Sequence, residues 1–408
     1  MISIHWEQHP VGHGGFHIGK LEASDGTNFS WAFDCGSRRT ARFNEYLEHR
    51  LARSRSALDW LFISHFDTDH VSGLDELMLG TDVRNVMVPY LENHEIVLLM
   101  LHEIDRGTFN RSIVEMAADS AAYFLSRGAS RVIFLGGGGR TADPDDASLP
   151  PDRPEDGRGW SFEMKPPAQS SSAPSWTARP EGMSPVEIVD DNSCDMEFNS
   201  PLGGLRLKPY RVPITEAAHT DLVAAIENLV GAKVSGSRRS GLGKLAYAVA
   251  HHARTQKGRA ELRKLYADHA GSSNRSSLSL LSVPIVVDDS KAEWHFNHRD
   301  RNQCGSGVVS WMNTGDAELL AKPDLEDWKS CYAADLAHVA ALALPHHGSD
   351  KNSGEPLQAL CPIASFLAHV SAKRGKHPGA NVTLAADERL CCVTEHFDAA
   401  ANMYFSCP

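Results

Sequence analysis

The chain has 408 residues, of which 42% are hydrophobic and 23% are charged, so a collagen-like or wholly disordered chain is excluded. Its 40 basic and 52 acidic residues give a formal net charge of −12, and any nucleic-acid contact must therefore use a local basic patch. The eight cysteines form no CxxC pair, the N-terminus carries no secretory pattern, and no apolar stretch approaches the ~20 residues of a membrane span. We expect a reduced, cytoplasmic protein that does not enter the membrane.

Short strands and one helix are predicted in the N-terminal part of the chain. Residues 15–21 and 29–33 have strand character on either side of a turn at 24–27. Helical spacing of apolar residues predicts a helix over 39–55. The apolar run at 59–64 is typical of a strand buried in a central sheet.

Strand and helix alternate in the next part of the chain, which predicts a layered α/β domain. We expect a helix from near Val71, a strand at 83–88, a long helical region at 93–126, and a strand at 131–135 that ends in four glycines. Residues 136–185 are rich in Pro, Gly, Ser and Asp, and we interpret them as a long surface insertion with little regular structure.

Regular patterning resumes after this insertion, with helices expected at 216–230 and 242–269 and a strand at 278–287. The helical part forms a second, basic insertion at 215–272. Within it, residues 238–264 carry eight basic residues and one acidic residue. This basic block has two interpretations, a solvated helix face or a contact for phosphate or a partner.

The buried strand at 59–64 runs directly into a loop rich in metal-binding side chains. Four such side chains fall within six residues: His65, Asp67, Asp69 and His70. A loop of this kind can aim imidazoles and carboxylates at two neighbouring points. A solvated aspartate-rich turn is the alternative, but it would not need a histidine at each end. The pattern favours a metal site.

Two more apolar strands end in similar residues. One leads into Gly315 and Asp316, and the strand at 341–344 leads into His346 and His347. Taken singly, a Gly-Asp turn is typical of a structural loop, and a histidine pair could be a coincidence. Three strand ends with the same ligand types favour one shared site at the C-terminal edge of a sheet.

Together these motifs resemble the metallo-β-lactamase fold. Residues 65–70 are similar to its metal-binding signature, in the variant that carries aspartate in place of the second histidine. This variant is similar to the hydrolase domain of the DNA-uptake competence protein ComEC and to phosphorylcholine esterase. Other segments agree with the family in chain order: 11–15 (with two departures from Val-Gly-Gln-Gly-Asp), 33–36, 274–278, 314–316, 345–349 and 377–378.

The resemblance implies an α/β fold in which two β-sheets lie between layers of helices, an αββα sandwich. We expect a single domain of this kind over 1–408, interrupted by the insertions at 136–185 and 215–272. The family also implies two divalent metal ions at one edge of the sandwich. Zinc is the expected metal and manganese the alternative, because carboxylates are numerous among the expected ligands.

The ligands are carried over from the family residue by residue. His65 and Asp67 would hold the first ion, and Asp69 and His70 the second. Asp316 would bridge the two ions.

The histidine pair and one further aspartate are assigned in the same way. His347 is favoured over His346 as a ligand of the second ion, and His346 would then face the substrate. Asp34 would orient the ligand loop from behind. Many members supply another histidine to the first ion, and no matching one is found here; His295 and His298 are the nearest alternatives in sequence.

These assignments predict a phosphodiesterase. Two divalent ions and three carboxylates leave about one positive charge, which suits a phosphoryl group. A water that bridges the ions would have its pKa lowered towards ~7 and would attack as hydroxide. Asp69 and His346 are the predicted catalytic residues, with His346 protonating the leaving oxygen. Lys376 and His377 are predicted to meet the substrate.

Three functions remain in competition. The first is a nuclease, because ComEC-like domains are implied to act on DNA and the block at 238–264 offers a polyanion a basic surface. The second is hydrolysis of a small ester (a cyclic nucleotide, a phosphocholine-type diester, a lactone or a thioester), with 136–185 as a lid. The third is a non-catalytic module that binds a protein partner through its insertions, although all six expected ligand positions carry competent residues.

Overall fold

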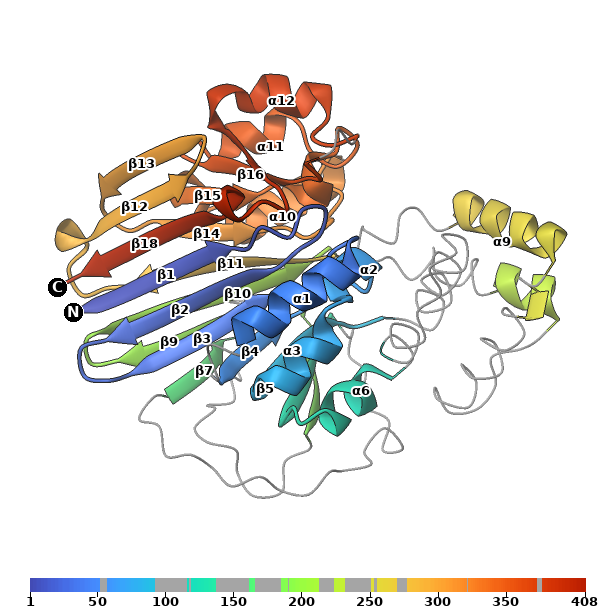
Figure 1. The fold of residues 1–408 in the computed structure, drawn as a ribbon, viewed down its shortest axis with the longest axis horizontal. Coiled ribbons are helices and arrows are strands. Elements are labelled where there is room, and N and C mark those ends of the chain that lie inside the picture. The colour runs from blue at the N-terminus through green and yellow to red at the C-terminus, as the bar shows by residue number, and fades with distance from the viewer. Residues whose placement is uncertain are drawn as a thin grey trace.

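Two β-sheets pack face to face, and helices cover their outer faces (Figure 1). The computed structural model describes residues 1–51, 57–91, 116, 119–136, 161–165, 185–189, 191–212, 224–231, 251–252, 255–269, 277–320, 322–372 and 376–408.

The first sheet has ten strands and contains the N-terminal half of the site. Its strands are, in spatial order, β13 (Arg301–Ser306), β12 (Glu293–His298), β18 (Ala401–Cys407), β1 (Ile2–Gln8), β2 (His17–Ala23), β3 (Asn28–Phe33), β4 (Leu58–Phe62), β5 (Val83–Pro89), β6 (Arg131–Leu135) and β8 (Val186–Val189). From β3 to β8 neighbouring strands are parallel, so their C-terminal ends lie at one edge.

The second sheet has eight strands. They are, in spatial order, β17 (Leu390–Val393), β16 (Ser365–His369), β15 (Val339–Ala343), β14 (Ser310–Asn313), β11 (Leu278–Ile285), β10 (Gly203–Arg211), β9 (Asp195–Ser200) and β7 (Ser161–Lys165). Strands β14 to β17 are parallel to one another.

The described helices connect the strands. They are α1 (Thr40–Leu51), α2 (Thr68–Val71), α3 (Leu74–Gly80), α6 (Ser120–Ser126), α9 (Gln256–His269), α10 (Lys322–Tyr332), α11 (Glu355–Leu360) and α12 (Ala380–Ala386). Short 3-10 helices are η3 (Asp289–Lys291), η4 (Leu336–His338), η5 (Pro345–Gly348), η6 (Asp387–Arg389) and η7 (Phe397–Ala399). None of the helices described combines the length and the apolar character needed to cross a bilayer.

Alternating side chains divide the apolar interior into three layers. In β4, Trp60 and Phe62 point between the sheets, whereas Leu61 packs with the helices that cover the first sheet. Leu47 of α1 belongs to that outer layer, and Trp328 of α10 belongs to the corresponding layer over the second sheet. Full burial of each such side chain contributes about 1.5–3 kcal/mol. This layering confirms the predicted αββα sandwich.

Several predicted elements match the observed ones. The strand at 131–135 coincides with β6, and the helix predicted over 39–55 is α1. The helical pattern near Val71 corresponds to two short helices, α2 and α3, rather than one. Of the helical region predicted at 93–126, the described residues include α6, and residues 93–115 lie outside the described part.

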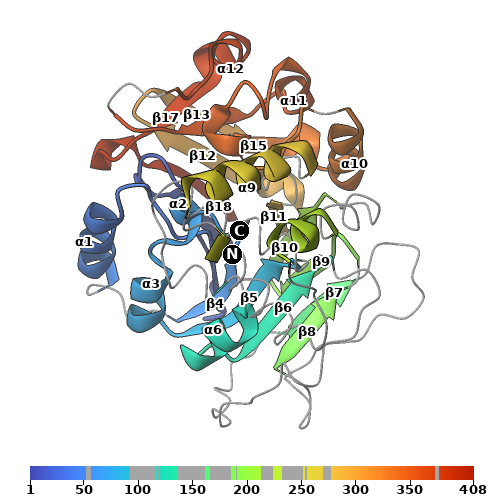
Figure 2. The ribbon, with the colours of Figure 1, turned by 90° about the vertical axis from the view of Figure 1, so that its right-hand side faces the viewer.

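The two predicted insertions fall mostly outside the described residues. Within 136–185, residues 161–165 form β7, an edge strand of the second sheet, where the sequence predicted little regular structure. Within 215–272, residues 224–230 and 251–252 are helical and α9 accounts for 256–269. Both views place α9 beyond the edge of the sheets where α2 lies (Figures 1 and 2).

Candidate metal centre

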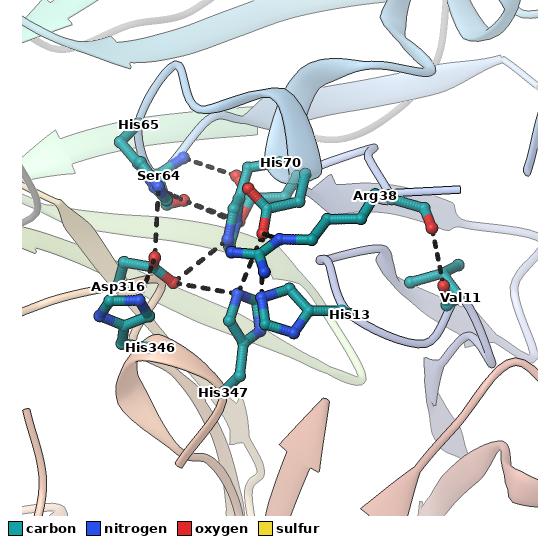
Figure 3. Close-up of polar contacts among 12 residues, drawn as sticks. Val11, His13, Arg38, Ser64, His65, His70, Asp316, His346 and His347 are labelled. Atoms are coloured by element: carbon teal, nitrogen blue, oxygen red, sulfur yellow. Dashed lines mark hydrogen bonds and ion pairs between the residues drawn. The ribbon is translucent and has the colours of Figure 1, made fainter. Parts of the chain in front are cut away.

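The predicted site residues meet where the C-terminal ends of strands from both sheets come together. Strand β1 runs in the same direction as β3, because each pairs antiparallel with β2. The loops after β1, β3 and β4 therefore lie at one edge of the first sheet. The loops after β14 and β15 face them from the second sheet, and Figure 3 shows side chains from both sides pointing toward one another.

His65, His70 and Asp316 form the first group of ligand atoms, and all three residues are buried. His70 Nε2 lies 3.2 Å from Asp316 Oδ1, and His65 Nε2 lies 3.6 Å from Asp316 Oδ2. One atom from each of the three residues falls within 4.8 Å of the other two. This spacing fits donor atoms placed around a single ion.

His13, Asp69 and His347 form the second group, within the same 4.8 Å limit. Asp69 Oδ2 lies 3.3 Å from His13 Nε2 and 3.4 Å from His347 Nε2. His347 Nε2 also lies 3.7 Å from Asp316 Oδ1, so Asp316 stands between the two groups. The arrangement offers two adjacent cation positions that share one carboxylate.

The grouping differs from the pairs carried over from the family. His70 lies with His65 rather than with Asp69. Asp67 is buried beside His65, where its charge acts on that imidazole, but it belongs to neither group. His13 takes part instead, and the sequence analysis did not assign it as a ligand.

His13 had one signal in the sequence. It is one of the two departures in residues 11–15, where the family pattern has glutamine. The loop that carries it is fixed by the neighbouring ligand loop: Gly15 N donates to Asp69 O at 3.1 Å, and Arg38 N donates to His13 O at 2.9 Å. The loops that carry His13 and Asp69 are far apart in the sequence, so local spacing could not indicate that His13 is a ligand.

Asp34 and Ser64 fix the tautomers of the first group. Asp34 Oδ1 accepts from Ser64 N, and Oδ2 accepts from Ser64 Oγ and from His70 Nδ1, all at 2.7 Å. Because the Ser64 hydroxyl donates to Asp34, it accepts from His65 Nδ1 at 2.9 Å. In its neutral form each of these histidines would therefore carry the ring proton on Nδ1 and turn Nε2 toward Asp316.

His346 and His347 adopt a backbone conformation that residues with side chains seldom take. Their φ angles are 47° and 58°, in the left-handed region, which costs of order 1–3 kcal/mol per residue. The strain separates the two rings: His347 is 1% exposed beside Asp69, whereas the side chain of His346 is 26% exposed with Nε2 3.8 Å from Asp316 Oδ2. His347 thus lies among the buried donor atoms, whereas His346 is partly exposed beside them.

The remaining predicted residues lie at different distances from the groups. The His377 ring centroid is 5.5 Å from that of His346 and 5.7 Å from that of His13. Lys376 is exposed, and among the described residues nothing links it to the site. His295 and His298 lie on β12, which three strands separate from β3, and they belong to neither group.

The site concentrates buried negative charge. Burial opposes ionisation of Asp69, yet interactions with His13 and His347 hold its pKa well below its usual range. Burial also opposes ionisation of Asp316, and the surrounding histidines lower its pKa well below the usual range. Both carboxylates are therefore ionised and need a positive partner.

Burial and the neighbouring carboxylates also shift the pKa values of the histidines at the site. Burial alone would lower the pKa of His70, but the flanking carboxylates Asp316 and Asp34 raise it well above its usual range. Burial lowers the pKa of His347 well below its usual range and that of His377 to about 4. Near pH 7 the His347 ring is therefore neutral and adds no positive charge to the second group.

The donor set fits divalent metal ions. The Nε2 atoms of four buried or nearly buried histidines approach carboxylate oxygens at 3.2 to 3.7 Å and make no well-formed hydrogen bond; they belong to His13, His65, His70 and His347. Imidazole and carboxylate donors suit zinc and leave manganese acceptable. A cation between each nitrogen and oxygen would satisfy both.

The comparisons with known proteins agree with the motif. The family model described as Metallo-beta-lactamase superfamily matches residues 33–158, which include the loop with His65 and His70. Residues 33–158 thus match a metallo-β-lactamase superfamily domain. Members of this superfamily bind divalent metal ions, often zinc. No curated protein gives a significant match to the sequence.

Two solved structures were matched to this chain. One is a long form RNase Z from yeast, with 9% identity and a TM-score of 0.32 over 91% of this chain and 37% of that chain. The other is the metallo-β-lactamase MIM-1 from Novosphingobium pentaromativorans, with 10% identity and a TM-score of 0.26 over 94% of this chain and 87% of that chain. The chain thus spans little more than a third of the yeast enzyme.

Replacing His13 with glutamine should remove one of two bound ions. Loss of an imidazole from the second group should weaken the affinity for the ion there by at least ~100-fold, because even the loss of a residue that only orients a ligand lowers metal affinity 10–100-fold. The first group should be unaffected, since His13 does not contact it. Metal analysis after dialysis against a zinc buffer would measure this. The exposed His338, replaced by glutamine, is the control, and an unchanged metal content in the His13 variant would contradict the assignment.

Proposed function

We propose that the protein is a metal-dependent phosphodiesterase that cleaves nucleic acid. The observation that carries the proposal is the pair of His/Asp groups joined by Asp316, with the partly exposed side chains of Arg38, His346 and His377 nearby. When bound, two divalent ions would supply an activated water and a positive surface for a phosphoryl group. The chain's own residues then have to hold these ions and handle the leaving-group proton.

His346 is placed to handle that proton. Asn352 Nδ2 donates to Asp316 O at 3.2 Å, which turns its Oδ1 toward His346. Oδ1 therefore accepts from His346 Nδ1 at 3.0 Å, and Nε2 is the atom that faces the site, 3.8 Å from Asp316 Oδ2. A protonated Nε2 can deliver its proton to the leaving oxygen, while Asn352 keeps the ring in orientation.

Two features support a polymer rather than a small ester as the substrate. The block at 238–264 is basic, and its described helix α9 lies beyond the same edge of the sheets as the site (Figure 2). The acidic residue of this block, Glu261, is paired with Lys257 at 3.7 Å and with His252 at 3.0 Å. Lys264 of α9 is exposed, and Lys257 keeps an 84% exposed side chain beside Glu261, so both are accessible to a polyanion.

Hydrolysis by metal-stripped protein resupplied with Zn²⁺ or Mn²⁺ tests the proposal. The substrates are single-stranded DNA, duplex DNA, RNA and bis-p-nitrophenyl phosphate, and the Asp69→Asn protein is the inactive control. Cleavage of a polymer that the variant lacks supports a nuclease. Cleavage of the small diester alone moves the substrate to small phosphodiesters. Metal binding with no cleavage contradicts the phosphodiesterase and leaves lactones, thioesters or a binding module.

A further inference from the structure

Two consecutive arginines near the site, Arg38 and Arg39, have different surroundings. Arg38 Nε lies 3.1 Å from Asp69 Oδ2, and the Arg38 side chain is 49% exposed. Arg39 instead turns away, with Nη1 2.6 Å from Glu395 Oε1 and Nη2 donating to Ser371 Oγ at 3.3 Å. Neither arginine belongs to the motifs that resemble the metallo-β-lactamase fold.

The backbone around Arg38 is held on both sides. Its N–H donates to His13 O at 2.9 Å. The preceding residue, Ser37, donates from Oγ to Val11 O at 2.8 Å and from N to Ser72 Oγ at 3.0 Å. The Arg38 side chain therefore starts from a fixed point between the loop that carries His13 and the end of α2, and Figure 3 shows its guanidinium reaching toward His13 and His70.

The guanidinium of Arg38 uses only part of its donor capacity. Among the residues that the structure describes, its one polar side-chain contact is the Nε contact with Asp69. The two Nη groups form the planar fork that matches two oxygens of a phosphate. Half exposure of the side chain leaves that fork accessible to a molecule that approaches Asp69 from solvent.

Charge decides what kind of molecule the fork would take. Asp69 is a proposed metal ligand, and a bound divalent ion would claim most of its negative charge. Arg38 would then stand beside a cation with its own charge only partly balanced, an arrangement that favours an anion bound by both. A neutral ester, lactone or thioester would bring no such anion.

We propose that Arg38 binds a non-bridging oxygen of the substrate phosphoryl group and so selects anionic phosphodiesters over neutral esters. The proposal rests on the proposed function, because it assigns a substrate contact within the same site. No covalent step passes through Arg38. Its part is to hold the anion against the ion at the second group, beside His13 and His347.

Three variants separate this role from a structural one: Arg38→Gln, Arg38→Lys and, as the matched control, Arg39→Gln. For Arg38→Gln, kcat/KM on bis-p-nitrophenyl phosphate should fall by ~30-fold, the range expected for one charged hydrogen bond. For Arg38→Lys, kcat/KM should lie between the values of the unmodified protein and of Arg38→Gln, because a lysine supplies the charge without the planar fork. Arg39→Gln should stay within ~3-fold of the unmodified protein, because Arg39 is committed to Glu395.

Two further readouts keep the role of Arg38 falsifiable. Turnover of p-nitrophenyl acetate, a neutral ester, should change by less than ~3-fold in Arg38→Gln. Calorimetric binding of inorganic phosphate to the zinc-loaded protein should weaken by ~10-fold or more in that variant. Zinc content and thermal melting are measured for each variant, so that loss of the site itself is recognised.

Several results would overturn the proposal. One is loss of zinc from the Arg38→Gln protein. Another is an equal loss of phosphodiester and p-nitrophenyl acetate turnover. In either case Arg38 would only position Asp69 and would not bind the substrate. Unchanged phosphate binding would also overturn it. If the unmodified protein cuts no phosphodiester but Arg38→Gln still loses phosphate affinity, the anion contact stands and the proposed function fails, so the two are told apart.

Discussion

Replacing Asp316 with asparagine should abolish hydrolysis, by ~100-fold at least, and remove most of the bound metal. The Asp316 carboxylate lies 3.2 Å from His70 Nε2 and 3.6 Å from His65 Nε2, and it contacts His347 and His346 at 3.7 and 3.8 Å. No other carboxylate among the described residues meets both groups. Asparagine keeps the shape and the backbone bond but loses the charge that both cation positions share.

Metal analysis and turnover of bis-p-nitrophenyl phosphate measure this effect. Asp25→Asn is the matched control, because Asp25 is exposed in the turn between β2 and β3, and its side-chain oxygen can still accept from Thr27 N after the change. The asparagine at 316 leaves the Asp316 N to Ser277 Oγ bond intact, so folding should survive. Two retained ions together with turnover within ~10-fold would refute the shared position of Asp316.

Gly14→Ala should lower the free energy of unfolding by about 4 kcal/mol, through backbone strain and overpacking together. Gly14 has φ +153°, and a Cβ there would lie 2.4 Å from Gly36 O, 2.6 Å from Asp69 O and 2.7 Å from Ser37 Cα. All three are backbone atoms, so none can swing aside. The loop must move, and His13 next to it must move with it.

Gly26→Ala is the control for the conformational part of that effect. Gly26 also has a positive φ, +88°, but a Cβ there meets nothing within 4 Å. It should cost about 1–2 kcal/mol. Urea unfolding of both variants measures the difference, and equal losses would show that the close approach of the two loops is not as described.

The sandwich could be predicted because its central strands are buried on both faces. β4 and β6 have continuous apolar runs that mark them without knowledge of their neighbours. Strand β1 was not predicted, although Ile2, Ile4 and Trp6 alternate with polar residues along it. Its partner β18 lies at the other end of the chain, and pairing over that distance leaves little local trace.

The site, too, could be predicted only where its residues are close together in the sequence. His65 to His70 lie in one short loop, so their spacing alone indicated a metal site. Which histidine faces which carboxylate depends on contacts made across the fold: Asp34 turns His70 toward the first group, and the loop after β1 brings His13 to Asp69. Neither contact is local, so the six-residue motif could name the ligands but not their grouping.

The site also ties the two sheets together. His13, His65 and Asp69 extend from the first sheet, whereas Asp316 and His347 extend from the second. An ion bound between them would have donors from both sheets, and this binding site forms only when the two sheets are packed together. Metal concentration therefore acts on the whole fold by mass action: at 100 times the dissociation constant it adds about 2.7 kcal/mol against separation of the sheets. Removal of the metal by a chelator should therefore lower the stability of the entire sandwich and not of its edge alone.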